Sequence, residues 1–386
     1  MNAMFAPTTF GCRVERLESR CLLSGGAAMA AAHMDDEHSP AVEMAEGHEA
    51  HGPLLPQLSV TPTLNPSTVP ANGDVNPYGV AFVPRGFARG GMLNPGDILV
   101  SNFNNSANLQ GTGTTITRVT PDGHASLFFQ GPVGLGLTTA LGVLRGGFVI
   151  VGNVPTTDGT SATIQPGSLL VLDRNGVQVA SFQDADLLNG PWDLTVNDEG
   201  SHAQVFVSNV LSGTVTRLDL RIHNDTVSVT GMTQIASRYA HRPDPAALEI
   251  GPTGLALDAE RGILYVASTG DNAVYAIKNA LRRPTDAGQG SLIYQDNNHL
   301  RGPLGLVLAP NGDLITTNGD AVNPDPTQVS EMVEFTTRGQ FVAQQSVDAS
   351  GAGGAFGIAL ARSGDKIVFA AVDDVNNTLE VWNLKM

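Results

Sequence analysis

Asparagine occupies the same position in several copies of a repeated strand pattern. In each copy it directly follows a short apolar run rich in β-branched residues. Amide oxygens that meet around one axis bind a cation or a polar ligand. Asparagine also tolerates left-handed backbone geometry and bonds its own turn, so a structural role explains the same pattern. The four residues are Asn102, Asn153, Asn209 and Asn318.

A largely apolar set recurs one position before the residue that opens each copy, which is usually glycine. Its aromatic members either form the floor of an apolar ligand pocket or simply fill a channel. In one copy Asp193 replaces the glycine, and a carboxylate there serves as a ligand, a base or a turn cap. The residues of this set are Tyr78, Leu141, Trp192, Thr253, Leu304 and Phe356.

The loop Val372–Asn377 concentrates side-chain oxygens near the C-terminus. Its two carboxylates, Asp373 and Asp374, make it a candidate site for a divalent cation such as calcium. The loop lacks the spaced pattern of an EF-hand. No other cofactor is expected, because the sequence contains no Walker loop, no dinucleotide fingerprint, and no G-x-S-x-G or H-E-x-x-H motif.

Short repeated strands position these residues. The stretch Gly251–Asn279 contains three apolar runs separated by Gly, Asp and Asn turns, which is typical of an antiparallel meander. Further copies follow one another at roughly 50 to 60 residues, and most continue into a fourth run. Six units of four strands predict an all-β fold, a six-bladed β-propeller. In such a fold both residue sets lie at the mouth of the central channel.

The last unit has no fourth strand of its own, because Met386 follows soon after its third run. The alternating segment Gln57–Thr63 precedes the first unit. We expect this N-terminal strand to complete the last blade and close the ring, which leaves only short, protected sheet edges. The propeller is therefore expected to span residues 57–386.

The first 56 residues differ from the repeat. Residues 13–24, RVERLESRCLLS, resemble the N-terminal export motif of many planctomycete secreted and surface proteins. An apolar, small-residue run follows the basic residues, as in a signal peptide. We therefore expect an export leader at residues 1–32 and a secreted or cell-surface location. Residues 33–56, rich in His and acidic residues, are expected to be a disordered linker, although four histidines there also offer a loose metal site.

The net charge is −16, from 37 acidic and 21 basic residues. Such a charge repels nucleic acids and anionic membrane surfaces, so neither is expected as a partner. After the leader, no stretch approaches the length of a membrane span. We expect a monomer whose partner is a protein, a glycan or a small molecule.

The unit pattern resembles NHL-repeat propellers and the six-bladed group that contains the gluconolactonase/SMP-30-like enzymes. Those enzymes bind a divalent metal in the channel through a Glu ahead of the first blade, an Asn in a Pro-Asn-Gly segment and an Asp after a second strand. Here Asn76–Pro77 leads into the first blade without a Glu, and the polar residues after the second strands are mainly Asn. The residues that carry the resemblance are Pro252, Gly254, Leu255, Ala256, Gly262, Leu264, Val266, Ser268, Pro303, Gly305, Leu306, Gly312, Asp313, Leu314 and Asn318.

Two functions follow from these observations. The first is a non-catalytic binding or scaffold module with its ligand at the channel mouth. The second is a metal-dependent hydrolase or lactonase. Converging carboxylates at the mouth favour the enzyme, whereas an apolar or neutral mouth favours the binding module.

Overall fold

The computed structural model describes residues 52–223, 225–319, 331–348, 354–363 and 366–385. The expected export leader and most of the expected linker lie outside these ranges. The described chain consists of antiparallel strands with a few short 3-10 helices. Among the described residues, no helix is long and apolar enough to cross a membrane.

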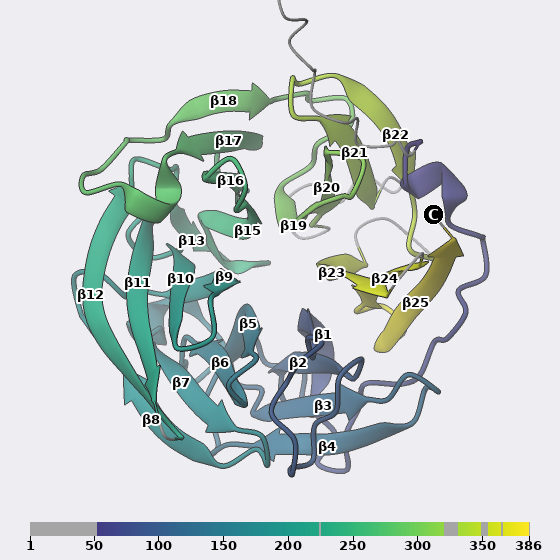
Figure 1. Cartoon of the computed structure of the whole chain (residues 1–386), viewed down its shortest axis with the longest axis vertical. Helices are drawn as coiled ribbons and strands as arrows, with labels where there is room; N and C mark the ends of the chain where they lie inside the picture. The colour runs from purple at the N-terminus through teal and green to yellow at the C-terminus, as the bar shows by residue number, and fades with distance from the viewer. Residues whose placement is uncertain (1–51, 224, 320–330, 349–353, 364–365, 386) are drawn as a thin grey trace, which may run out of the picture. The chain divides into compact units, whose positions relative to one another are not determined.

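Six sheets stand around a central axis, as Figure 1 shows, and the predicted all-β, six-bladed propeller is confirmed. Five sheets have four strands and the last has three, each paired in chain order. Blades 1 to 3 comprise β1 (Val75–Phe82), β2 (Ile98–Asn104), β3 (Thr115–Val119), β4 (Ala125–Gln130), β5 (Leu137–Leu144), β6 (Phe148–Asn153), β7 (Ser168–Asp173), β8 (Gln178–Phe182), β9 (Pro191–Asp198), β10 (His202–Asn209), β11 (Thr214–His223) and β12 (Thr226–Ala236). Blades 4 to 6 comprise β15 (Pro252–Asp258), β16 (Ile263–Ser268), β17 (Ala273–Lys278), β18 (Ser291–Tyr294), β19 (Pro303–Leu308), β20 (Asp313–Asn318), β21 (Met332–Thr336), β22 (Phe341–Gln345), β23 (Ala355–Ser363), β24 (Lys366–Asp373) and β25 (Thr378–Lys385).

Glycine allows the innermost strands to approach one another closely. A Cβ atom on Gly254 would lie 2.2 Å from the carbonyl oxygen of Leu304 in the next blade. A Cβ atom on Gly305 would lie 2.4 Å from the carbonyl oxygen of Phe356. Both neighbours are backbone atoms, so the strand itself would have to move. The repeated glycine is thus explained by the packing of the ring.

Apolar side chains on both faces of the blades pack against the adjacent blades. Between blades 2 and 3, for example, Ile150, Val171, Leu194 and Val205 belong to one buried cluster. Full burial of such a side chain contributes roughly 1.5–3 kcal/mol. The interfaces between blades therefore hold the first strands, and the side chains that begin them, in fixed positions.

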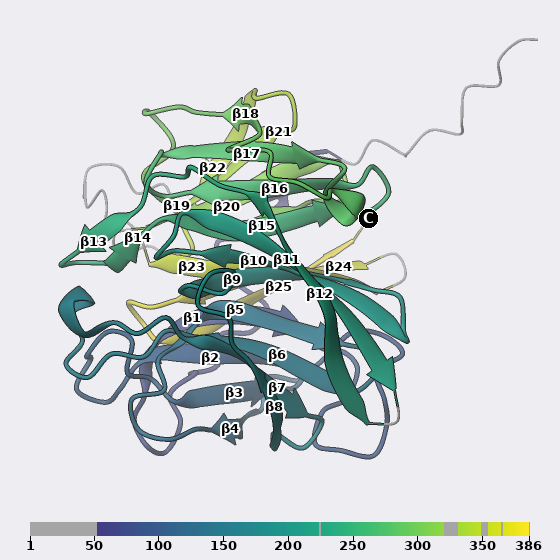
Figure 2. The ribbon, with the colours of Figure 1, turned by 90° about the vertical axis from the view of Figure 1, so that its left-hand side faces the viewer.

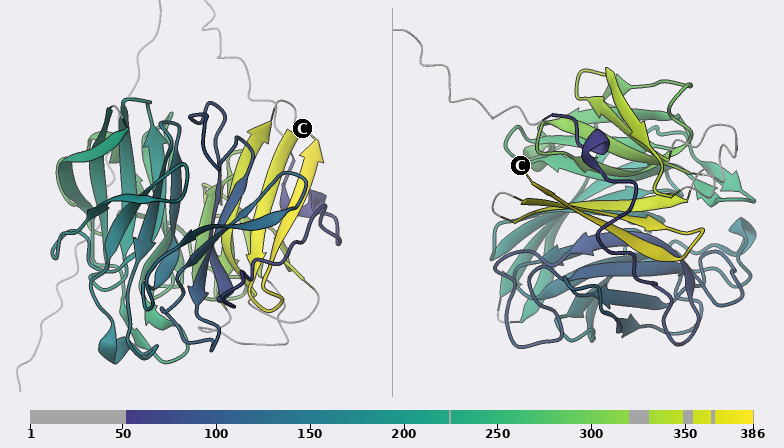
Figure 3. Two further views of the ribbon diagram at one scale, coloured as in Figure 1. Left: turned by 90° about the horizontal axis from the view of Figure 1, so that it is seen from below. Right: turned by 90° about the vertical axis from the view of Figure 1, so that its right-hand side faces the viewer.

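The segment that precedes blade 1 runs along the outer edge of β25 (Figure 3). Leu64 pairs with Val381, and Ser67 pairs with Thr378, as isolated antiparallel bridges. No strand forms over Gln57–Thr63, where the sequence predicts one. A regular closing strand remains a prediction. The backbone contacts with β25 begin at the end of this segment, where the N–H of Thr63 donates to the carbonyl oxygen of Val381 over 2.7 Å, and they continue at Leu64 and Pro66.

A hairpin without a counterpart in the repeat connects blades 3 and 4. Its strands β13 (Arg242–Asp244) and β14 (Leu248–Ile250) extend beyond the blades on one face (Figure 2). The side chain of Gln110, in the β2–β3 connection, donates from Nε2 to the carbonyl oxygen of Ala246 over 2.6 Å. This bond ties the hairpin to blade 1. The 3-10 helices are η1 (Leu55–Gln57), η2 (Ser161–Thr163) and η3 (Ala280–Arg282).

Candidate ligand site at the channel mouth

A cavity of about 600 Å³ opens at one end of the channel. Its wall is built from the first residues of inner strands, from connections between second and third strands, and from the β13–β14 hairpin. This volume lies within the range of roughly 300–1,000 Å³ that is usual for small-molecule sites. Its main lining residues are Asn76, Tyr78, Phe103, Asn104, Gln110, Trp192, Glu249, Leu304, Phe356 and Asp374.

Four aromatic rings form the floor of the cavity. Tyr78 stacks on Phe103 with ring centroids 4.6 Å apart, and it contacts Phe356 at the same centroid distance. Trp192 meets Tyr78 and Phe103 edge-on at 6.0 and 5.5 Å. Aromatic pairs attract one another at such distances. The structure thus brings together Tyr78, Trp192 and Phe356, which the sequence places at the mouth, and adds Phe103.

Several buried polar atoms around the cavity have no hydrogen-bond partner within the described chain. They are Nε1 of Trp192 and the side-chain oxygens of Asn76, Asn104 and Gln110. Asn104 Nδ2 donates to Oδ1 of Asn108 over 2.7 Å, and Gln110 Nε2 donates to the hairpin backbone. These bonds orient both amides and leave their oxygens unused. Because buried polar groups are normally paired, water or a ligand is expected to complete them.

The hairpin brings a carboxyl group to the cavity wall. Glu249 is 5% exposed, and burial raises its pKa to about 7, while His241 opposes this rise and Asp244 adds to it. The preceding residue, Leu248, holds a φ of 62°, which side-chain-bearing residues rarely adopt. Its buried side chain packs in the same apolar cluster as Trp192, which offsets the backbone cost. Glu249 is therefore held at the mouth by a well-anchored hairpin.

Asp193 follows Trp192 but is not among the residues that line the cavity. Its Oδ1 accepts a hydrogen bond from the backbone N–H of Leu194 over 2.7 Å. Burial raises the pKa of Asp193 well above its ordinary value, against the opposing effect of backbone N–H groups at Leu194 and Leu255. This environment favours the neutral acid, and its contacts correspond to a cap on the inner strands. The proposed role as ligand or base remains a prediction.

The four asparagines of the repeat point into their own blades. None of them is among the residues that line the cavity, and none has the positive φ that the sequence interpretation expected. Asn102 Nδ2 donates to the carbonyl oxygen of Thr68 over 3.2 Å, and Asn209 Nδ2 donates to that of Leu187 over 3.1 Å. Asn153 Nδ2 instead donates to the hydroxyl of Ser168. Because none of the four has a positive φ, the prediction of a left-handed turn at these positions is wrong.

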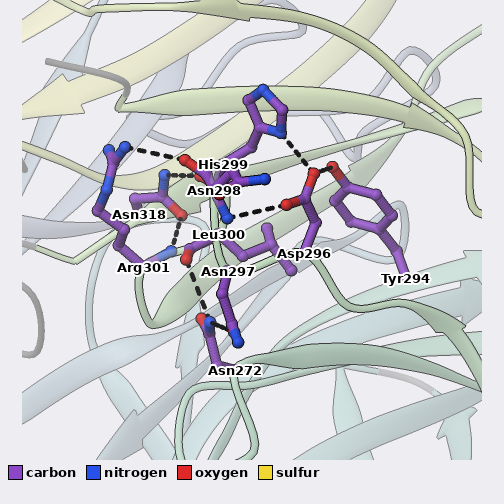
Figure 4. Close-up of polar contacts among 9 residues, drawn as sticks. All are labelled: Asn272, Tyr294, Asp296, Asn297, Asn298, His299, Leu300, Arg301 and Asn318. Atoms are coloured by element: carbon purple, nitrogen blue, oxygen red, sulfur yellow. Dashed lines mark hydrogen bonds and ion pairs between the residues drawn. The ribbon is translucent and has the colours of Figure 1, made fainter. Parts of the chain in front are cut away.

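Asn318 makes the same kind of bond in blade 5 (Figure 4). Its Nδ2 donates to the carbonyl oxygen of His299 over 2.7 Å, and its Oδ1 accepts from the backbone N–H of Arg301 over 2.8 Å. In the same connection, Asp296 accepts from the hydroxyl of Tyr294 over 2.9 Å and from Nδ1 of His299. In three blades, the asparagine after the second strand thus fixes the segment that leads into the first strand. These contacts agree with a structural role for the repeated asparagines, which is the alternative to ligand binding.

The two candidate cation ligands lie in different environments. Asp373 is buried, and its oxygens accept from the backbone N–H groups of Val375 and Asn376 and from Nδ2 of Asn376. Burial and the nearby Asp348 raise the pKa of Asp373. Asp374 lines the mouth cavity. Within the described ranges, no three His, Cys, Asp or Glu side chains are grouped to hold a metal ion, so this cation site stays a prediction.

The residues around the channel do not match the metal ligands of the gluconolactonase-like enzymes, which are a Glu, an Asn and an Asp. Asn76 stands where the chain enters blade 1, and the asparagines after the second strands are engaged by their own blades. We therefore assign no chemical step to a channel metal.

Neither a protein-family model nor a curated protein sequence matches this chain. Several solved structures are similar to this chain at low sequence identity. A luciferin-regenerating enzyme is 10% identical, with a TM-score of 0.49 over 83% of this chain and 95% of that one. A calcium-binding regucalcin from Agrobacterium tumefaciens is 13% identical, with a TM-score of 0.48 over 84% and 96%. A streptogramin B lyase is 13% identical, with a TM-score of 0.46 over 83% and 87%.

Proposed function

We propose that this chain is a secreted or cell-surface β-propeller that binds a small molecule at the channel mouth and does not transform it. The observation that carries the proposal is the set of unpaired polar atoms above the aromatic floor. An unpaired buried polar group costs roughly 1–3 kcal/mol, and a ligand that pairs with it recovers this free energy. Trp192 offers a donor, while Asn76, Asn104 and Gln110 offer acceptors.

The arrangement favours binding over hydrolysis. Two carboxyl groups, those of Glu249 and Asp374, line the cavity, but within the described ranges they belong to no group of three side chains that could hold a metal ion. Asp193 and the asparagines after the second strands, which the sequence offers as a base and as metal ligands, are bonded within the blades. The aromatic floor and the rim of amides instead resemble a recognition surface, in which apolar contact supplies affinity and a few polar groups fix orientation.

Secretion is supported by the sequence of the leader and is part of the same proposal. It is tested by expression of the full chain in a planctomycete host, followed by fractionation. The protein is expected outside the cytoplasm, and a variant with Arg20→Ala and Leu22→Ala is expected to stay inside. Equal distribution of both forms would contradict secretion through this leader.

The two tryptophans of the chain provide a direct test of binding. Trp192 lies in the cavity floor, whereas Trp382 lies in blade 6 and donates to the carbonyl oxygen of Ser59. In a Trp382→Phe variant, Trp192 is therefore the sole tryptophan that reports emission. A set of small aromatic and polar compounds is titrated into this variant and into Trp192→Phe. We expect at least one compound to change Trp192 emission saturably and to leave Trp382 emission unchanged. No such compound, or equal responses in both variants, would refute the proposal.

A further inference from the structure

The charge of the cavity wall is one-sided. The described lining residues include two carboxyl groups, Glu249 and Asp374, and they include no lysine, arginine or histidine. The whole chain contains 21 basic residues, so basic side chains were available to the fold, and none of those in the described ranges lines the cavity. A partly enclosed wall with one sign of charge concentrates ligands of the opposite sign.

The unpaired amide atoms show the same preference. At Asn76, Asn104 and Gln110 the atom that has no partner among the described residues is the oxygen, which accepts hydrogen bonds and cannot donate them. Asn104 is 3% exposed, and its Nδ2 is already engaged by Asn108, so its orientation is set. A group with several N–H donors in a small volume suits such acceptors. An ammonium group carries up to three N–H donors and a positive charge.

The floor accommodates the rest of such a ligand. The faces of aromatic rings carry partial negative charge and attract cations, and their area buries apolar groups. Tyr78, Phe103, Trp192 and Phe356 supply that surface. The remaining unpaired donor, Nε1 of Trp192, would find an acceptor in a hydroxyl oxygen or in the π-face of an aryl group on the ligand.

We propose that the mouth cavity selects a small organic ammonium ion with an apolar or aryl body, an inference that rests on the proposed function. Glu249 and Asp374 balance the charge, the oxygens of Asn76, Asn104 and Gln110 accept the N–H groups, and the aromatic floor contacts the body. The raised pKa of Glu249, which burial causes, agrees with this assignment, because a cationic ligand beside the carboxylate offsets the cost of ionising it.

Three probes of similar size test the charge preference. Phenethylammonium, phenylacetamide and phenylacetate share a phenyl ring and differ in charge. Each is titrated into the Trp382→Phe variant at pH 8, where Glu249 is mostly ionised, and Trp192 emission is followed. We expect phenethylammonium to bind at least tenfold more tightly than phenylacetamide, and phenylacetate to bind most weakly.

Charge-matched variants assign the effect to the cavity. Glu249→Gln is expected to weaken phenethylammonium binding at least fivefold and to leave phenylacetamide binding unchanged. Glu260→Gln removes the same charge at an exposed turn between β15 and β16 and is expected to change neither. Asp374→Asn serves as a second cavity variant if Glu249→Gln unfolds.

The outcomes separate this inference from the function on which it rests. If phenylacetamide or phenylacetate binds as tightly as phenethylammonium, the cavity is a small-molecule site without a cation preference, and this inference is wrong. An equal loss of affinity in Glu249→Gln and Glu260→Gln would also overturn it. If none of the three probes and no compound of the wider set changes Trp192 emission, the proposed function itself fails.

Discussion

Replacement of Glu249 by glutamine should stabilise the propeller at pH 8 and have little effect at pH 4.5. Burial raises the pKa of this carboxyl from 4.5 to about 7 in the folded protein. Between these pH values the folded state holds a proton that the unfolded state has lost. The contribution of Glu249 to the free energy of unfolding therefore falls as the pH rises from about 4.5 to 7. Above pH 7 the full cost of the buried carboxylate is present. Glutamine does not titrate and carries no such penalty.

The magnitude follows from the pKa difference. One pKa unit corresponds to about 1.4 kcal/mol, so a rise from 4.5 to about 7 corresponds to about 3 kcal/mol. The residue is 5% exposed, but the carboxyl group faces the solvent of the cavity, which screens its charge. We therefore expect a gain of about 1.5 kcal/mol at pH 8. For a propeller of roughly 330 residues, this gain raises Tm by about 2 °C.

Urea unfolding of the wild type and of Glu249→Gln at pH 4.5 and pH 8 measures the effect, with Glu260→Gln as the control. Burial also raises the pKa of Glu331 and Glu380 to about 7, so both forms should keep part of their pH dependence. The difference between wild type and Glu249→Gln should appear only at pH 8. A variant that is equally stable or less stable than the wild type at pH 8, or a constant difference at both pH values, would refute this account of Glu249.

Three further changes test the fold. Gly254→Ala places Cβ 2.2 Å from the carbonyl oxygen of Leu304 and should lower the free energy of unfolding in urea by about 3 kcal/mol. In the control Gly231→Ala the nearest atom is 3.6 Å from Cβ, and the free energy of unfolding should change by no more than about 0.5 kcal/mol. Equal effects of the two changes would contradict the packing argument. Asn209→Ala should cost about 2 kcal/mol because Nδ2 bonds are lost inside blade 3, and an unchanged midpoint would argue against its structural role. A chain without residues 52–68 should unfold at lower urea concentration, because the edge of β25 loses its backbone contacts; the same midpoint would show that this segment does not stabilise blade 6.

Strand positions could be predicted closely from the sequence. The stretch Gly251–Asn279, for which the sequence predicts three strands, contains β15, β16 and β17. Short strands bounded by Gly, Asn and Asp turns have few alternative registers, and the pattern recurs in six copies, so each copy supports the strand positions predicted in the others. The same repetition locates the inner glycines and, one position earlier, the aromatic residues of the cavity floor.

Side-chain directions at the mouth could not be predicted in the same way. The position of Asn209 was clear, but its side chain turns into the blade because neighbouring carbonyl and hydroxyl groups there need a donor. Glu249 belongs to a hairpin that occurs once, so no repeat marks it. Asn104 and Gln110 lie at the end of β2 and in the loop that follows, where the unused oxygen of each amide depends on a tertiary hydrogen bond. The one local signal for this region was the long β2–β3 connection on the mouth face.

The central claim is that the mouth cavity binds a small molecule without transforming it. Saturation-transfer NMR with the compound set tests this claim most directly, using the wild type and Ala247→Trp, in which an indole ring on the hairpin fills part of the cavity. We predict signals for at least one compound with the wild type, their loss with Ala247→Trp, and recovery of the compound unchanged after prolonged incubation. No compound whose signal depends on the open cavity, or conversion of a bound compound into a product, would contradict the account.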